Sequence, residues 1–160
     1  MMGAGKTTLG KIVSKMANLK FIDTDANIEK SCLMKISEIF KKKGEKFFRL
    51  EERKEVLKIL KANNLVIALG GGAFTDKTIR DNILKNAISI WLDVNLKDLN
   101  KRTKWNNNRP LLNKENNQKV INKLYENRKS IYKLANYRIN CDNLSKENIA
   151  KKIITLYEKY

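Results

Sequence analysis

Histidine is absent from the 160-residue sequence, which also has a single proline and only two cysteines. Without histidine there is no Cys/His zinc site and no catalytic Ser-His or Cys-His pair. Cys32 and Cys141 are far apart and lack CxxC spacing, which excludes a redox motif of that kind. No apolar run approaches the roughly 20 residues that a membrane-spanning helix needs, and residues 1–6 lack the basic and apolar stretches of a signal peptide. We therefore expect a cytoplasmic protein without a membrane segment.

The composition is typical of one ordinary globular core. With 160 residues, of which 42% are hydrophobic and 32% charged, the chain is long enough for one core and too short for two. We predict a single domain over residues 1–160 that is a monomer.

The chain has an excess of basic residues, with 34 Lys and Arg against 17 Asp and Glu. A net charge of +17 raises nucleic acid as a partner, because basic surfaces neutralise phosphates whatever their sequence. However, 27 of the basic residues are lysines scattered along nearly every segment, and the 20 asparagines point to a general compositional bias. We therefore expect no nucleic-acid partner.

Short apolar runs alternate with longer segments of helical periodicity, which indicates an α/β fold with a mainly parallel sheet. The expected strands are 21–23, 65–69, 87–92 and 137–141. Helices are expected over 5–17, 36–43, 45–62, after a Thr75 N-cap, over 117–135 and after Ser145. The polar, Asn-rich segment from Thr103 to Glu115 contains the only proline and is typical of a functional loop.

The chain begins with the second half of a phosphate-binding loop that opens a helix. Glycines allow close backbone approach, helical N–H groups bind phosphate oxygens, Lys6 supplies charge and Thr7 can ligate Mg²⁺. The predicted nucleotide-binding residues of the loop are Gly3, Ala4, Gly5, Lys6, Thr7 and Thr8. The first glycine of the full GxxxxGK[ST] pattern would fall one position before Met1. We therefore predict an apolar strand, ending in Gly, upstream of the first residue.

Asp23 and Asp25 follow an apolar strand, and their spacing places both carboxylates on one side at the strand's carboxyl end. One can help to hold Mg²⁺ or its waters, and the other can accept a hydroxyl proton. The alternative is an Asx cluster that caps the next helix.

Three consecutive glycines, Gly70, Gly71 and Gly72, follow another strand and would let a ligand lie against bare backbone; a plain turn is the alternative. Arg128 lies within an apolar helix stripe, where a guanidinium is costly unless an anion meets it or it snorkels at the edge. Arg49 and Glu52 are i, i+3 partners that could also form an ordinary surface pair.

Two further arginines, Arg102 and Arg109, lie in or beside the proline-containing loop. An arginine on a closing lid can neutralise charge on a transferred phosphoryl group, whereas a solvated loop arginine would have no such role.

Taken together, these motifs resemble the shikimate kinase family in order and over almost the whole chain, from Gly3 to about Tyr137. The matching segments are GAGKTTLGK, FIDTDANIE, the run from Ile36 through Gly44-Glu45 to Arg49 with Glu52, LGGG, RPLL at 109–112, and Arg128 four residues before Tyr132. The resemblance implies a three-layer P-loop kinase fold of the nucleoside-monophosphate-kinase type. That fold has a central five-stranded parallel sheet, a substrate-binding helical region at about 24–62 and a lid at about 103–115. It also implies transfer of the γ-phosphate of ATP to the 3-hydroxyl of shikimate, with Mg²⁺.

The resemblance also implies roles for the residues that match its motifs. Lys6, Asp25 and Arg109 would be catalytic, with Asp25 at the shikimate hydroxyls as the candidate base. Thr7 and Asp23 would serve the metal, and Arg102 and Arg109 the nucleotide. The substrate-binding set would be Asp25, Arg49, Glu52, Gly70, Gly71, Gly72 and Arg128, with the two arginines on the shikimate carboxylate.

Two alternatives remain at this point. A related small-metabolite kinase, such as gluconate kinase or a nucleoside-monophosphate kinase, would share the phosphate loop. A basic nucleic-acid-binding ATPase would account for the charge, but it offers no reason for the paired aspartates with the glycine triplet.

Overall fold

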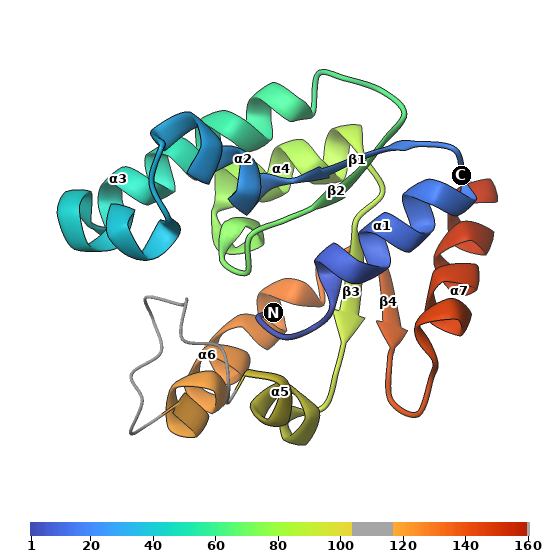
Figure 1. Cartoon of the computed structure of the whole chain (residues 1–160). Coiled ribbons are helices and arrows are strands. Elements are labelled where there is room, and N and C mark those ends of the chain that lie inside the picture. The colour runs from blue at the N-terminus through green and yellow to red at the C-terminus, as the bar shows by residue number, and fades with distance from the viewer. Residues whose placement is uncertain (104–116, 160) are drawn as a thin grey trace.

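The computed structural model describes residues 1–103 and 117–159 of the chain (Figure 1). In chain order, its elements are α1 (Lys6–Met16), β1 (Lys20–Asp23), α2 (Thr24–Cys32), α3 (Ile36–Ile59), β2 (Leu65–Ala68), the 3-10 helix η1 (Ala73–Thr75), α4 (Lys77–Asn86), β3 (Ile90–Asp93), α5 (Leu96–Thr103), α6 (Asn117–Tyr132), β4 (Tyr137–Asn140) and α7 (Lys146–Glu158). The alternation of strands and helices confirms the predicted α/β class.

The strands form two parallel pairs. β1 pairs with β2 so that Asp23 lies opposite Ala68, and β3 pairs with β4 so that Asp93 lies opposite Asn140. No described strand joins β2 to β3, so the single five-stranded sheet is not formed by the described residues. A phosphate loop normally follows a strand, and among the described residues no strand precedes α1.

The helices bury apolar faces against these strands. α1 packs on β1, β2 and α7, while α3 packs on α2 and α4. The larger core cluster includes Leu9 of α1, Val56 of α3, Trp91 of β3 and Ile139 of β4. Trp91 is buried; its ring lies 6.1 Å from that of Tyr132, and the Arg138 guanidinium lies over it.

A second, smaller core holds α2 against α3. Ile28, Ile39 and Phe48 are each at most 4% exposed and form its centre. This cluster fixes the predicted substrate-binding region as a helical layer beside β1.

Several element predictions were incomplete. Apolar periodicity did not predict α2 or α5, because each is short and offers few apolar positions; only the resemblance implied a helical region over α2. Thr75 is not the N-cap of α4; that cap is Asp76, whose Oδ1 accepts from the Ile79 N–H at 3.0 Å. The predicted helices 36–43 and 45–62 are one element broken at Gly44, where φ is 82° and ψ is 167°.

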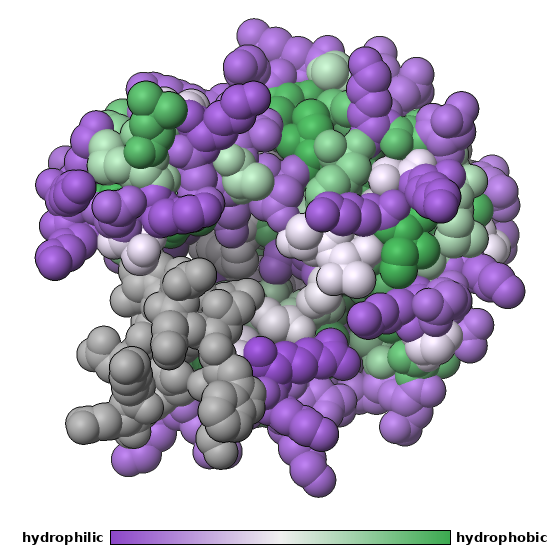
Figure 2. Space-filling view, in the orientation of Figure 1, coloured by the Kyte–Doolittle hydropathy of each residue, from purple (hydrophilic) through white to green (hydrophobic). Residues whose placement is uncertain are grey.

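Polar side chains cover most of the face seen in Figure 2, and apolar patches are small and separate. Among the described residues, no helix is both long and apolar enough to cross a membrane.

Candidate active site

The phosphate loop meets α1 through glycines with positive φ. Gly3 has φ 74° and Gly5, the N-cap of α1, has φ 84°, a region that side chains disfavour. No side chain caps the first turn of α1, so its N–H groups point outward, as an anion-binding helix start requires. The Lys6 ammonium donates to the Met1 carbonyl at 2.8 Å, and Arg102 donates to the Gly3 carbonyl at 3.4 Å. The structure thus brings Arg102 to the predicted nucleotide loop.

Asp23 connects the phosphate loop to α2. Its Oδ2 accepts from the Thr7 hydroxyl at 2.6 Å, while its Oδ1 accepts from the backbone N–H groups of Asp25 and Ala26. Asp23 therefore caps a helix, as the structural alternative predicted, and still presents one oxygen to Thr7. A hydroxyl and a carboxylate side by side are the hard oxygen ligands that Mg²⁺ prefers, so these residues fit the expected ion.

Thr24 fixes the start of the glycine segment. It is fully buried; its hydroxyl donates to the Ala68 carbonyl at 3.3 Å and accepts from the Gly70 N–H at 3.0 Å. Because α2 begins at Thr24, this contact ties Asp25, in the first turn of α2, to Gly70 at the carboxyl end of β2.

Two of the three glycines, Gly70 and Gly72, are needed because charged side chains occupy the space where a Cβ would lie, whereas Gly71 has room for one. A Cβ on Gly70 would lie 2.5 Å from Glu52 Oε1 and 2.6 Å from Asp25 Oδ1. A Cβ on Gly72 would lie 2.6 Å from Nη1 of Arg49, and one on Gly71 would lie 3.8 Å from Nη1 of Arg128. The structure therefore brings together all the described residues of the predicted substrate site, from α2, α3, α6 and the end of β2.

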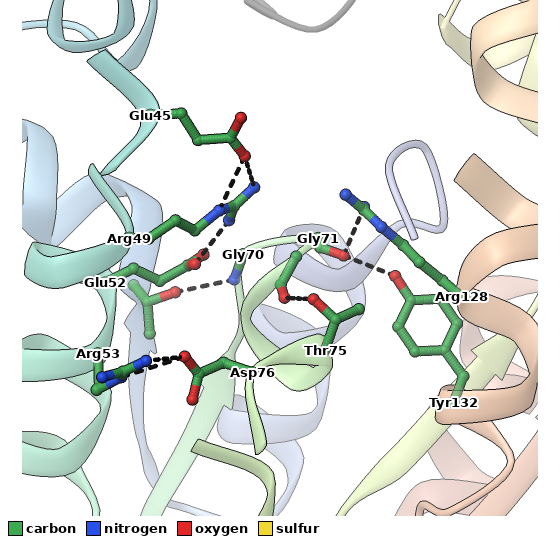
Figure 3. A network of polar contacts seen from close by, with 12 residues as sticks. Glu45, Arg49, Glu52, Arg53, Gly70, Gly71, Thr75, Asp76, Arg128 and Tyr132 are labelled. Carbon is green, nitrogen blue, oxygen red and sulfur yellow. Dashed lines mark hydrogen bonds and ion pairs between the residues drawn. The ribbon is translucent and has the colours of Figure 1, made fainter. Parts of the chain in front are cut away.

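Arg49 and Glu52 form a partly buried ion pair at this site (Figure 3). Arg49 Nη1 donates to Glu52 Oε2 at 2.7 Å, and the Glu52 side chain is only 2% exposed. Burial raises the pKa of Glu52 and the Arg49 charge only partly offsets this, while the charge of Asp25 raises it further. For Arg49, burial acts to lower the pKa, but Glu52 and Glu45 outweigh it and the pKa is raised. Arg49 is therefore a permanent positive charge.

Arg128 approaches the glycine segment from α6, on the side opposite Arg49 (Figure 3). Its Nη1 donates to the Gly71 carbonyl at 2.9 Å, and the Tyr132 hydroxyl donates to the same oxygen at 2.6 Å. The Arg128 guanidinium is therefore hydrogen-bonded to a backbone carbonyl and does not simply extend into solvent from the edge of the apolar stripe. Two guanidinium groups thus lie on either side of the glycine segment, an arrangement that suits a small anion between them.

Arg109 and most of the predicted lid at about 103–115 lie outside the described residues. Of that segment the structure places only Thr103, the last residue of α5, whose methyl group lies against Gly3.

Comparison with known proteins identifies the family. The family profile described as shikimate kinase matches residues 2–158. The chain belongs to the shikimate kinase family.

Individual relatives agree with this family. A curated shikimate kinase of Bartonella henselae is 40% identical over 160 residues, covering all of this chain and 76% of that protein. One of Sulfurihydrogenibium sp. is 42% identical over 154 residues, covering 96% of this chain and 92% of that protein. A solved shikimate kinase of Acinetobacter baumannii in complex with shikimate is 33% identical and covers 99% of this chain and 89% of its own, with a TM-score of 0.94.

Two residues of the site, Thr24 and Tyr132, lie within the motifs quoted from the sequence, but sequence reasoning gave them no role. Thr24 lies between the two aspartates, and its role follows only from the pairing of β1 with β2, which brings Ala68 and Gly70 to it. Tyr132 lies four residues after Arg128, which places both on one helix face, and this spacing was the available signal.

Proposed function

We propose that this chain is an ATP-dependent shikimate kinase that transfers the γ-phosphate of ATP to the 3-hydroxyl of shikimate, giving shikimate 3-phosphate and ADP. The observation that carries the proposal is the glycine segment, where two arginines and two carboxylates converge beside a phosphate loop. A small carboxylated polyol matches this arrangement, because its carboxylate pairs with guanidinium groups and its hydroxyls with acidic side chains.

The nucleotide phosphates would lie at the start of α1. The uncapped N–H groups there and the Lys6 ammonium would bind phosphate oxygens, and Lys6 would exchange the Met1 carbonyl for them. Arg102, already at Gly3, would lie along the nucleotide. Arg109, outside the described residues, is proposed to reach the phosphoryl group from the lid.

Thr7 and Asp23 would hold Mg²⁺, with phosphate oxygens and water as its other ligands. When bound, the ion would neutralise negative charge on the phosphates during transfer.

The substrate would be aligned rather than strongly activated. Arg49 and Arg128 would bind its carboxylate and Asp25 its hydroxyls, which orients the 3-hydroxyl for attack. Asp25 is also the candidate base, although proton removal contributes little when the transition state is loose.

A five-stranded sheet is also part of the proposal. A strand leading into the phosphate loop and pairing with both β2 and β3 would join the two described pairs into one sheet.

The direct test is ADP release with ATP and shikimate compared with ATP alone. We expect release to depend on shikimate, and gluconate and nucleoside monophosphates to be poor acceptors. Equal rates with a nucleoside monophosphate would overturn the substrate assignment while leaving the phosphate loop in place.

A further inference from the structure

Arg49 has a second acidic neighbour besides Glu52. Its Nε and Nη2 atoms both donate to Oε1 of Glu45, at 3.2 and 3.0 Å (Figure 3). The Arg49 guanidinium is thus hydrogen-bonded to two carboxylates of the protein itself, those of Glu45 and Glu52.

The contacts of Arg49 leave few ways to bind a further carboxylate. Glu52 takes Nη1, and both Nη atoms lie within 2.9 Å of the position that a Gly72 Cβ would occupy. The remaining edge that can bind a carboxylate with two parallel hydrogen bonds is the Nε–Nη2 edge. That edge is the one that Glu45 occupies.

The two glutamates differ in how easily they can leave. The side chain of Glu52 is 2% exposed and lies between Arg49 and the glycine segment, whereas that of Glu45 is 55% exposed. An exposed ion pair contributes little, because water solvates the separated charges almost as well. Of the two, Glu45 is the group that an incoming anion can displace.

The backbone places Glu45 at the start of a helical segment. Gly44, with φ 82°, breaks α3 immediately before it. Glu45 therefore begins the segment that carries Arg49 one turn later, and the i, i+4 spacing brings the two side chains together.

We propose that Glu45 sets the affinity for the acidic substrate by competing with the substrate carboxylate for the Nε–Nη2 edge of Arg49. Glu45 holds this edge in the free enzyme and leaves it when the substrate binds. The proposal rests on the proposed function, in which Arg49 binds the substrate carboxylate.

The test compares Glu45→Gln with the wild type by steady-state kinetics and by calorimetric binding of shikimate. The glutamine removes the competing charge, so we expect KM and Kd for shikimate to fall by about two- to fivefold, the range of an exposed ion pair. We expect kcat and the KM for ATP to stay unchanged, because Glu45 contacts neither the reacting hydroxyl nor the phosphate loop. The neutral carboxamide of shikimate, which cannot compete for the edge as an anion, should bind both proteins equally.

Glu51→Gln is the matched control, because it removes the same charge from the same helix but its side chain pairs with Lys54. If Glu51→Gln lowers the KM for shikimate as much, the effect is one of net charge and the proposal is overturned. A higher KM in Glu45→Gln overturns it too, since Glu45 would then be orienting Arg49 for the substrate.

Arg49→Ala separates this proposal from the proposed function. An unchanged KM for shikimate in Arg49→Ala would remove Arg49 from the substrate site, and both proposals would fail. A raised KM in Arg49→Ala with no gain in Glu45→Gln would overturn the competition alone.

Discussion

A methyl group on Gly70 would occupy space that two carboxylate oxygens already fill. The Cβ of Gly70→Ala would lie 2.5 Å from Glu52 Oε1, and Glu52 is buried and bonded to Arg49. We expect Gly70→Ala to lower the free energy of unfolding by about 1–3 kcal/mol, as overpacking does, and to raise the KM for shikimate. Urea unfolding and steady-state kinetics measure the two effects.

Gly71→Ala is the control for this substitution. Its Cβ would have neighbours no closer than 3.5 Å, which is ordinary van der Waals contact. If the two variants lost stability equally, the glycine segment would be sensitive to any side chain. The close contacts at Gly70 would then not explain the loss.

Arg128→Ala tests whether this arginine binds the substrate carboxylate. A hydrogen bond to a charged group contributes about 1.5–3 kcal/mol, so we expect the KM for shikimate to rise tenfold or more. The KM for ATP should change little, because Arg128 contacts the glycine segment at Gly71 and not the phosphate loop. Lys123→Ala removes an exposed charge from the same helix and should leave both constants unchanged. An unaltered KM for shikimate would exclude Arg128 from the site.

Glu52 should make stability depend on pH. Burial raises its pKa in the folded state above the ordinary value of 4.5, so the folded protein keeps this proton to higher pH than the unfolded chain does. The free energy of unfolding therefore falls as the pH rises from about 4.5 through the raised pKa. Glu52→Gln lacks this titration, so its stability relative to the wild type should improve over that range, as urea unfolding at several pH values can measure. Parallel pH curves for the two proteins would contradict the expectation.

At the scale of the elements, α4 begins at a side chain that serves two partners. The Oδ1 atom of Asp76 caps α4 by accepting from the Ile79 N–H at 3.0 Å. Its Oδ2 atom accepts from Nε and Nη2 of Arg53 in α3, at 3.1 and 2.5 Å. Asp76→Ala loses both contacts and should cost about 1 kcal/mol or more in unfolding free energy, whereas Asp76→Asn keeps a capping oxygen and should lose less.

The pH dependence of the Asp76 contribution has the opposite sign to that of Glu52. Burial acts to raise the pKa of Asp76, but the hydrogen bonds from Arg53 and from the Ile79 N–H outweigh it and lower the pKa below 3.8. The stabilisation is thus complete above pH 3.8 and is lost as the pH falls through the lowered value. Chemical denaturation at low and neutral pH measures the unfolding free energies of the wild type and of Asp76→Ala. The difference between the two proteins should be smaller in acid.

The elements show where sequence reasoning succeeds. The strand positions and the longer helices were confirmed to within a few residues, because apolar periodicity directly reflects which face is buried. Periodicity did not predict α2, because the Asp23 cap decides where it starts and the small core with α3 decides which face is buried. The Asx alternative at Asp23 was the available sequence signal for this helix. The site residues on different elements were identified from motifs, but their meeting at the glycine segment depends on packing.

At the scale of the whole molecule, the basic residues behind the charge of +17 are scattered along nearly every segment of the sequence. Most described ion pairs are exposed, and several join residues three or four apart on one helix. The expectation of no nucleic-acid partner stays a prediction, since composition alone cannot say whether lysines on different elements meet on one face.

The pairing of the strands was the least predictable feature of the whole molecule. Each strand of the described chain has four residues, and such short runs specify a strand without specifying its neighbour. Periodicity therefore predicted the parallel strands but not their division into two separate pairs.

That division has a consequence for the rate at which backbone amides exchange with deuterium. Along β2 and β3, alternate N–H groups point toward β1 or β4, and the others point away from these partners. We expect the amides of residues 1–160 to exchange along these strands with a period of two, slow and fast in turn, which amide-resolved NMR can record. A chain extended before Met1 by an apolar strand ending in Gly should slow the fast set in both strands at once. Exchange that remained periodic in the extended chain would rule out a strand between β2 and β3.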